Sequence, residues 1–225
     1  MMARWLTVTT LWLAAMAGLL LGTAGDPRWL NGWLLIGELA AFCYPLGFWL
    51  HRHDPALLAA RLSPPFHRDQ KTWDRVFMAL AGLSFVAWMA LMALDARRFA
   101  WSSMPAWLQP AGVLLIAACL SVAWVTFRFN SFAAPQVRVQ ADRGQRVITD
   151  GPYRVVRHPM YSGAALLFIG APLLLGSWWG LAVAPLLIAG TAARAVGEER
   201  VLRRELAGYD AYAQRVRYRL LPGVW

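Results

Sequence analysis

The residues best suited to chemistry lie in a short basic segment at 151–163, which reads GPYRVVRHPMYSG and leads into an apolar run. Pro159 suits the first turn of a helix, because an amide hydrogen at that position has no partner within the helix. His158 would then be the N-cap residue, and Tyr161 would lie about one turn further on a similar face. The segment therefore predicts either a binding site for a carboxylate or phosphate or, on composition alone, a basic anchor at the lipid headgroups.

A second group of residues combines Arg194 with Glu198 and Glu199. Arg194 and Glu198 are four residues apart on a predicted helix and so share a face. A solvated ion pair, worth about 0.3 kcal/mol, would explain them without any function. Alternatively, Arg194 holds an anionic acceptor at the membrane edge while Glu198 pairs with a cationic group of a cofactor. The pair alone leaves both interpretations open.

The elements that must position these residues are membrane helices. The chain is 59% hydrophobic and contains 13 tryptophans, whereas soluble domains are nearer ~45–50% apolar. This excludes an ordinary soluble domain. The formal charge of +10 indicates a charge bias between the two membrane faces rather than nucleic-acid binding. Cys43 and Cys119 lie in apolar segments, which favours small hydrophobic residues over a disulfide.

Six apolar runs approach the ~20 residues that a membrane crossing requires. They are 5–24, 30–50, 75–94, 107–128, 160–176 and 178–196. The last two are separated only by a short turn, so we expect a tight helical hairpin in which one or both helices fall short of a full crossing. The first run is longer than the apolar core of a signal peptide, ~7–15 residues, which favours a retained helix. We expect an all-α polytopic membrane protein of about six helices.

The basic residues predict the orientation of these helices, because cytoplasmic connections are rich in lysine and arginine. One set of connections carries 19 of the 22 basic residues. These are Arg4, Arg52, Arg61, Arg68, Lys71, Arg75, Arg128, Arg138, Arg143, Arg146, Arg154, Arg157, Arg194, Arg200, Arg203, Arg204, Arg215, Arg217 and Arg219. The opposite set holds Arg28, Arg97 and Arg98. We therefore expect an integral protein of a bacterial inner membrane with both termini in the cytoplasm.

The two groups of polar residues together resemble the isoprenylcysteine carboxyl methyltransferase family and its phospholipid N-methyltransferase relatives. Those enzymes carry a G-x-Y…R-H-P-x-Y segment, a short membrane hairpin, a Glu-Glu pair and a tail with Tyr-x-x-Tyr. The matching residues are Gly151, Tyr153, Arg157, His158, Pro159, Tyr161, Glu198, Glu199, Tyr209, Tyr212, Arg215 and Val216. The resemblance covers residues 138–225 and implies an N-terminal part of transmembrane helices (1–129) followed by a cofactor-binding region (130–225).

The resemblance implies S-adenosylmethionine as the cofactor, held between the loop before the hairpin and the tail after it. The implied cofactor-binding residues are Gln140, Val147, Ile148, Tyr153, His158, Pro159, Met160, Tyr161, Glu198 and Glu199. Arg194 would orient the methyl acceptor, a lipidic or amphipathic molecule that enters from the bilayer and is expected to carry a carboxylate. A carboxylate is already an anion at neutral pH, so catalysis would rest on alignment and desolvation rather than on a general base.

Several alternatives stay open. The acceptor could instead be a phospholipid or another lipid methylated on nitrogen or oxygen. The ending VRYRLLPGVW resembles NADPH-dependent sterol reductases, and a membrane protein without enzymatic activity is a further possibility. His51 and His53 are expected at the headgroups rather than in a metal site. Glu38 inside the second helix either faces the acceptor, or is protonated or bonded to a neighbouring helix. We expect membrane lipids as partners, no metal and no nucleic acid; the sequence does not predict an oligomeric state.

Overall fold

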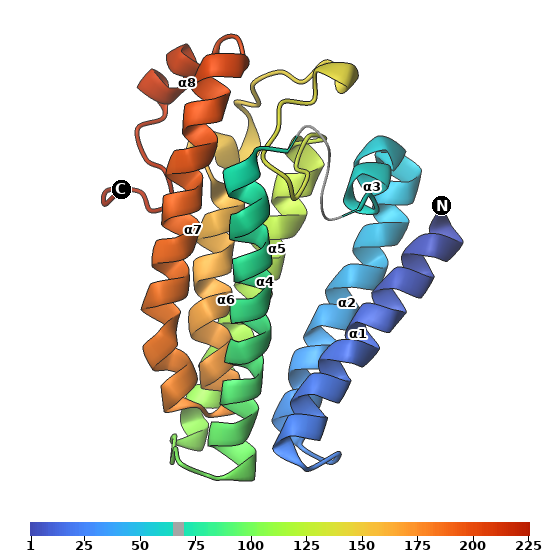
Figure 1. Ribbon diagram of the computed structural model, residues 1–225, viewed down its shortest axis with the longest axis vertical. Helices are drawn as coiled ribbons and strands as arrows, with labels where there is room; N and C mark the ends of the chain where they lie inside the picture. The colour runs from blue at the N-terminus through green and yellow to red at the C-terminus, as the bar shows by residue number, and fades with distance from the viewer. Residues whose placement is uncertain (65–69) are drawn as a thin grey trace.

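The computed structural model describes residues 1–64 and 70–225, and within these residues the chain is helical without any strand (Figure 1). Arg68, one of the basic residues counted above, lies outside the described residues. The longer helices are α1 (Met2–Ala24), α2 (Leu30–His53), α4 (Thr72–Ala93), α5 (Gln109–Phe129), α6 (Pro159–Leu175) and α7 (Trp178–Glu205). The shorter elements are α3 (Pro55–Arg61), η1 (Leu94–Arg98), η2 (Ala106–Leu108), η3 (Ala141–Arg143), η4 (Gly151–Arg154) and α8 (Tyr209–Arg215).

Within residues 1–64 and 70–225, five helices are long and apolar enough to cross a membrane: α1, α2, α4 with η1, η2 with α5, and α7. The sixth, α6, has 17 residues and spans only about 25 Å at 1.5 Å per residue, less than the ~30 Å of a hydrocarbon core. The predicted all-α polytopic fold is confirmed. The short member of the predicted hairpin is α6, whereas α7 continues well past the predicted end of its apolar run.

The predicted tight turn between α6 and α7 is also confirmed. Gly176 ends α6 in the left-handed conformation (φ 86°), and the Ser177 hydroxyl accepts a hydrogen bond from the amide of Gly180 at the start of α7. Ser177 also donates to Asp95 Oδ2 over 2.6 Å. Asp95 is fully buried in the π-helical turn that ends α4. The turn is thereby fastened to the end of α4, which fixes the position of both hairpin helices.

Close packing of α5 against α6 completes the frame around the site. A Cβ atom on Gly112 of α5 would lie 2.3 Å from the backbone nitrogen of Leu174 in α6, so only glycine permits this approach. A hydrophobic core that includes Leu20, Leu35 and Met92 extends from these helices to α1, α2 and α4. In Figure 1, α1 and α2 run side by side as a pair next to the group formed by α4 to α7.

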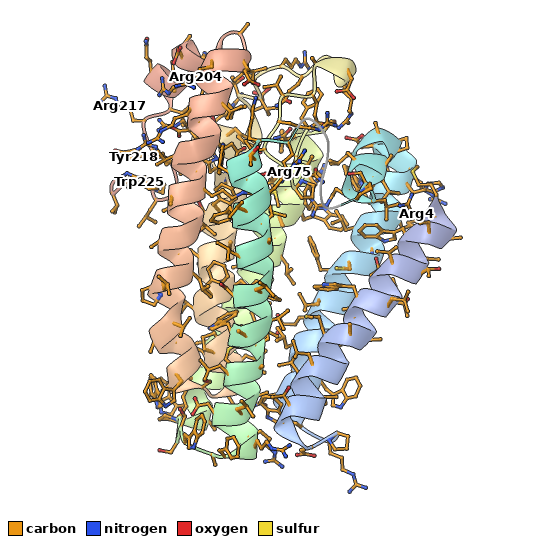
Figure 2. All side chains as sticks on the ribbon, viewed as in Figure 1. Arg4, Arg75, Arg204, Arg217, Tyr218 and Trp225 are labelled. Carbon is orange, nitrogen blue, oxygen red and sulfur yellow. The ribbon has the colours of Figure 1, made fainter. Side chains whose placement is uncertain are left out.

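The polar connections gather at one end of the bundle, which we call the charged end. The N-terminus, the connection after α2, the connection between α5 and α6 and the tail after α7 all lie there (Figure 1). Figure 2 shows Arg4, Arg75, Arg204 and Arg217 at this end. The grouping of basic residues agrees with the predicted charge asymmetry. That this end faces the cytoplasm stays a prediction.

Candidate active site

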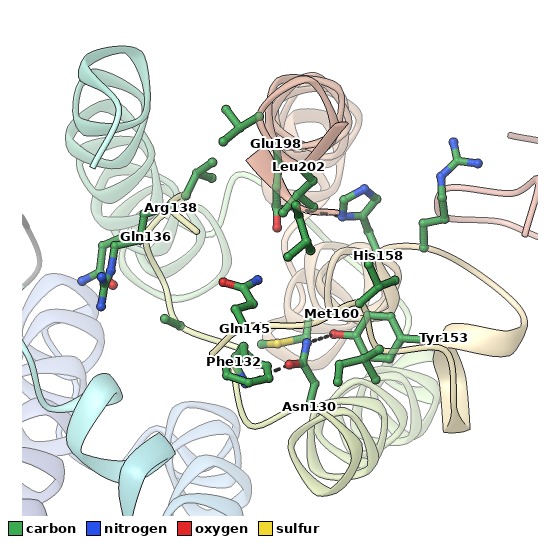
Figure 3. A pocket seen from close by; sticks show the side chains of 18 of the residues that line it. Asn130, Phe132, Gln136, Arg138, Gln145, Tyr153, His158, Met160, Glu198 and Leu202 are labelled. Atoms are coloured by element: carbon green, nitrogen blue, oxygen red, sulfur yellow. Dashed lines mark hydrogen bonds and ion pairs between the residues drawn. The ribbon is translucent and has the colours of Figure 1, made fainter. Parts of the chain in front are cut away.

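A cavity of about 290 Å³ lies at the charged end (Figure 3). Its walls come from the end of α3, from α4, from the connection 130–148, from the first residues of α6, and from α7 and the tail. The α6–α7 hairpin brings the start of one helix beside the end of the other, so residues about 40 positions apart meet at the same wall. Residues from both predicted groups line this cavity.

Most of the predicted site residues line this cavity. They are Val147, Ile148, Tyr153, His158, Pro159, Met160, Tyr161, Arg194 and Glu198. Gln140 and Glu199 do not belong to its lining, and Glu38 lies elsewhere, inside α2, with both carboxyl oxygens buried and without a hydrogen-bond partner among the described residues. The roles assigned to the lining residues stay predictions; the structure supplies their arrangement.

Glu198 is the one acidic residue among those described that line the cavity. The hydroxyl of Tyr161 donates to its Oε2 atom over 2.7 Å. The ring of His158 stacks on that of Tyr161, with the ring centres 5.4 Å apart, and His158 Nδ1 lies 3.9 Å from the same Oε2 atom. One oxygen of the carboxylate is therefore held in place, while Oε1 keeps its lone pairs for a donor inside the cavity.

The start of α6 offers fewer free amide groups than predicted. His158 is its N-cap residue and Pro159 its first residue, as expected from the sequence. The carbonyl of His158, however, accepts hydrogen bonds from the amides of both Tyr161 and Ser162, at 3.0 and 3.2 Å. Since Pro159 has no amide hydrogen, most donors of this first turn are absent or already used. An anion in the cavity must depend mainly on arginine side chains.

Arg194 lines the cavity, and two of its side-chain nitrogens are held by other parts of the chain. Its Nε atom donates to Asp74 Oδ1 over 2.9 Å and its Nη2 atom to the carbonyl of Pro135 over 2.6 Å. The guanidinium carbon lies 5.8 Å from the ring centre of Tyr161. The third nitrogen, Nη1, has no hydrogen-bond partner within the described residues. Arg194 thus forms a buried pair with α4 rather than a solvated pair with Glu198, which is four residues along its own helix.

Asp74 is a site residue that sequence reasoning missed. It is fully buried at the start of α4 and accepts hydrogen bonds from Arg194, from the amide of Val137 and from Gln70. A buried carboxylate with three donors is a firm support for the guanidinium. The available signal was an acidic residue in the first turn of a membrane helix, surrounded by basic residues.

Asn130 and Arg61 also line the cavity, although the sequence analysis did not assign them to the site. The side-chain amide of Asn130, at the end of α5, donates to the hydroxyl of Tyr153 over 2.6 Å (Figure 3). Burial raises the pKa of Tyr153 well above its usual value, so the phenol stays protonated at neutral pH. Arg61 reaches the opposite wall from α3, where it donates to the carbonyl of Ala133 over 3.1 Å and packs over the ring of Phe127. Burial lowers the pKa of Arg61 to about 10, which leaves it charged at neutral pH.

Glu199 lies outside the cavity and binds residues that flank it. Its carboxylate is buried and accepts hydrogen bonds from Arg157 Nε over 2.6 Å and from Arg219 Nε over 3.1 Å. The Nε2 atom of the His158 ring lies within hydrogen-bond distance of the same carboxylate, at 3.2 Å. Arg157 also donates to the carbonyls of Val216 and Arg217, over 2.8 and 3.0 Å. The Arg157–Glu199 pair therefore fastens the tail to the start of α6. Glu199 therefore binds Arg157, Arg219 and His158 and does not line the cavity as predicted.

Gln140 also forms its hydrogen bonds within the protein and does not line the cavity. Its side chain is buried, donates to the carbonyl of Phe132 over 2.8 Å and accepts from Arg143 over 2.6 Å. Its backbone amide donates to Gln145 Oε1 over 2.7 Å. Gln145, and not Gln140, belongs to the lining of the cavity. The side chain of Gln140 stabilises the fold of the connection between α5 and α6, and Gln145 is among the polar residues that this connection contributes to the lining of the cavity.

Comparison with known proteins finds one family that matches this part of the chain. Residues 108–207 match the phospholipid methyltransferase family. A search of curated proteins found no match. The matched range runs from the start of α5 to the end of α7 and contains the hairpin, Arg194 and Glu198. The match confirms the predicted resemblance as far as the phospholipid methyltransferase relatives are concerned, and it suggests a membrane methyltransferase. The isoprenylcysteine carboxyl methyltransferase part of the resemblance stays a prediction.

Proposed function

We propose, from the match of residues 108–207 to the phospholipid methyltransferase family, that the protein is an S-adenosylmethionine-dependent methyltransferase embedded in the membrane. Its acceptor is a lipidic or amphipathic molecule, and the group methylated is a carboxylate of the isoprenylcysteine type. The observation that carries the proposal is the cavity that joins Tyr161 and Glu198 to Arg194. Its volume of about 290 Å³ lies near the lower limit of the usual ~300–1,000 Å³ for small-molecule sites.

The residues around the cavity fit S-adenosylmethionine. Glu198 offers a free carboxylate oxygen to a cationic amino group or to ribose hydroxyls, and an aromatic ring such as that of Tyr161 suits a sulfonium. Val147 and Ile148 give an apolar wall for an adenine ring beside the hydroxyl of Tyr153. We assign the polar contact from the preceding connection to Gln145 instead of Gln140, because Gln145 faces the cavity.

Arg194 fits the role of acceptor binding. Its Nε and Nη2 atoms are fixed by Asp74 and Pro135, so Nη1 is presented to a ligand in a defined direction. When bound, the cofactor supplies an electrophilic methyl group on a cationic sulfur, and a carboxylate oxygen can take that group without losing a proton. The protein's own task is then to align the two partners and to exclude water, which can account for a large part of a rate enhancement.

A phospholipid amine is a second candidate acceptor, favoured by the position of Glu198. An ammonium group must lose a proton before it can accept a methyl group. Glu198 is the acidic group available for this among the described residues of the cavity, and its Oε1 atom has no hydrogen-bond partner among them. The two acceptors make different demands on this residue: a carboxylate acceptor needs Glu198 only for cofactor binding, whereas an amine acceptor also needs it as a base.

The proposal predicts that S-adenosylhomocysteine raises the unfolding temperature of the detergent-purified protein and that NADPH does not. Glu198→Gln should weaken S-adenosylhomocysteine binding by about tenfold or more, because a charge-assisted hydrogen bond is worth ~1.5–3 kcal/mol. Thermal unfolding over a ligand titration measures both effects. Glu205→Gln is the matched control, since Glu205 lies on the same helix but is exposed and pairs with Lys71.

Stabilisation by NADPH alone would point to a reductase. Absence of a response to either ligand in a folded protein would contradict the proposed cofactor. Equal weakening in Glu198→Gln and Glu205→Gln would show that Glu198 does not contact the cofactor.

A further inference from the structure

A second, more open cavity of about 970 Å³ lies between α4 and α7, outside the candidate active site. It is a groove along the outer side of these two helices, and Arg194 and Val201 are the residues that it shares with the first cavity. The two cavities therefore meet at the Arg194 side chain. None of the sequence motifs and none of the roles proposed above accounts for this groove.

The groove is basic at the charged end of the bundle. Four cationic side chains line it, and two of them are neutralised: Lys71 pairs with Glu205 over 2.6 Å, and Arg194 pairs with Asp74 over 2.9 Å. The other two, Arg200 and Arg204, are exposed and form no ion pair or hydrogen bond through their side chains within the described residues. They are four residues apart and so lie on one face of α7. The rim of the groove carries two unneutralised positive charges.

Further from the charged end the groove is apolar. Val76, Phe77 and Leu80 line it from α4, and Ala193 and Val196 line it from α7. Nine residues of helix separate Lys71 from Leu80, or about 13 Å along the axis. This exceeds the thickness of the headgroup layer, ~5–8 Å per leaflet. With Lys71 at the headgroups, Leu80 lies in the hydrocarbon region, as an acyl chain requires.

An exposed aromatic residue marks the boundary between these two parts. The indole ring of Trp73 packs against α7 at Gly197, where an added Cβ atom would lie 2.7 Å from the ring. Trp73 is partly exposed, and tryptophan prefers the boundary between headgroups and hydrocarbon. The groove thus presents charge, an interfacial ring and an apolar floor in the order in which a phospholipid presents phosphate, glycerol and acyl chain.

We propose that the α4–α7 groove binds an acidic phospholipid, with its phosphate at Arg200 and Arg204 and one acyl chain along Phe77 and Leu80. Two free guanidinium groups favour a headgroup with a net negative charge over a zwitterionic one, whose own ammonium would oppose them. This lipid is a resident of the groove and not the methyl acceptor. The inference is independent of the proposed function, because it rests on a different cavity and requires no cofactor.

Native mass spectrometry of the full-length protein, exposed to equal amounts of phosphatidylglycerol and phosphatidylcholine in detergent, tests this site. We expect the protein to retain phosphatidylglycerol in preference. The double substitution Arg200→Gln/Arg204→Gln should lower this retention about 30-fold, since it removes two contacts to a phosphate and each is worth roughly 1 kcal/mol near a membrane. Arg215→Gln/Arg217→Gln is the matched control, because it removes two exposed charges from the same end but outside the groove.

A second variant separates the groove from general surface charge. Ala193 is exposed on the groove wall, so Ala193→Trp should fill the acyl-chain path without disturbing the core. We expect this variant to lose phosphatidylglycerol although its charge is unchanged. Equal retention by the two double arginine variants, or undiminished retention by Ala193→Trp, would overturn the proposal.

Discussion

Substitution of Arg194 by glutamine should lower methyl transfer at least about 100-fold while leaving the affinity for S-adenosylhomocysteine within about twofold. A misplacement of reacting groups by ~1 Å is enough for a loss of that size. Arg194 is fixed by Asp74 and by the Pro135 carbonyl, and we assign it to the acceptor rather than to the cofactor. The measurements are the initial rate with radiolabelled S-adenosylmethionine and the binding of S-adenosylhomocysteine by the same preparation.

The single substitution also leaves Asp74 as a buried charge without its partner, which typically costs ~3–5 kcal/mol. We therefore pair it with Asp74→Asn/Arg194→Gln, which removes both charges and should unfold at a temperature nearer that of the unsubstituted protein. Arg203→Gln serves as the control, because Arg203 is exposed on the same helix and pairs with Asp210. If the double variant transfers methyl groups at the normal rate, Arg194 does not bind the acceptor.

The second large effect concerns stability. Arg157→Met should lower the free energy of unfolding by about 3–5 kcal/mol, because it removes the main partner of a buried carboxylate, Glu199. It should also release the tail, since Arg157 donates to the carbonyls of Val216 and Arg217. Thermal unfolding and limited trypsin digestion measure the two effects. Cleavage in the tail should become faster in this variant.

Arg154→Met is the matched control for this prediction. Arg154 lies three residues earlier, and its ion pair with Asp150 is exposed, with side-chain exposures of 74% and 64%. An exposed pair of this kind contributes about 0–1 kcal/mol. Equal unfolding temperatures and equal tail cleavage in Arg157→Met and Arg154→Met would show that the buried pair does not fasten the tail.

The helices were predictable because each one is determined by the length and hydropathy of its own segment. Each apolar run must satisfy its backbone hydrogen bonds within itself in a membrane, so length and hydropathy are enough to place it. The hairpin followed from the short connection at Gly176 and Ser177. The length of α7 was underestimated, because its last turns leave the hydrocarbon and become basic while remaining helical. Hydropathy alone gives no signal for such an extension.

The site was predictable where a motif specifies a helix start, as at His158 and Pro159, but not where it depends on helix rotation. Neighbouring residues on a helix point about 100° apart. Glu198 therefore faces the cavity and Glu199 faces the tail, and the Glu-Glu motif does not distinguish them. Asp74 was missed because its partner Arg194 is 120 residues away, a contact that only the packing of α4 on α7 creates.

The connection between α5 and α6 shows a different limit. It is irregular, so no periodicity indicates which side chains point inward. Gln140 was assigned to the cofactor by resemblance, whereas Gln145 takes the position at the cavity because Gln140 is used to fold the connection. Polar residues in such segments can either satisfy the backbone or contact a ligand, and their order in the sequence does not decide between the two.

The most direct test of the central claim is transfer of a tritiated methyl group from S-adenosylmethionine to lipid by the purified protein. A total lipid extract of the producing organism supplies the acceptor, and the lipid-bound label is recovered and subjected to mild alkaline hydrolysis. We predict that base releases this label as volatile methanol, as from a methyl ester, and that the label is absent with Asp74→Asn/Arg194→Gln. Label that stays non-volatile after hydrolysis would assign the methyl group to nitrogen instead, and a folded protein that transfers no label to any lipid would contradict the methyltransferase function itself.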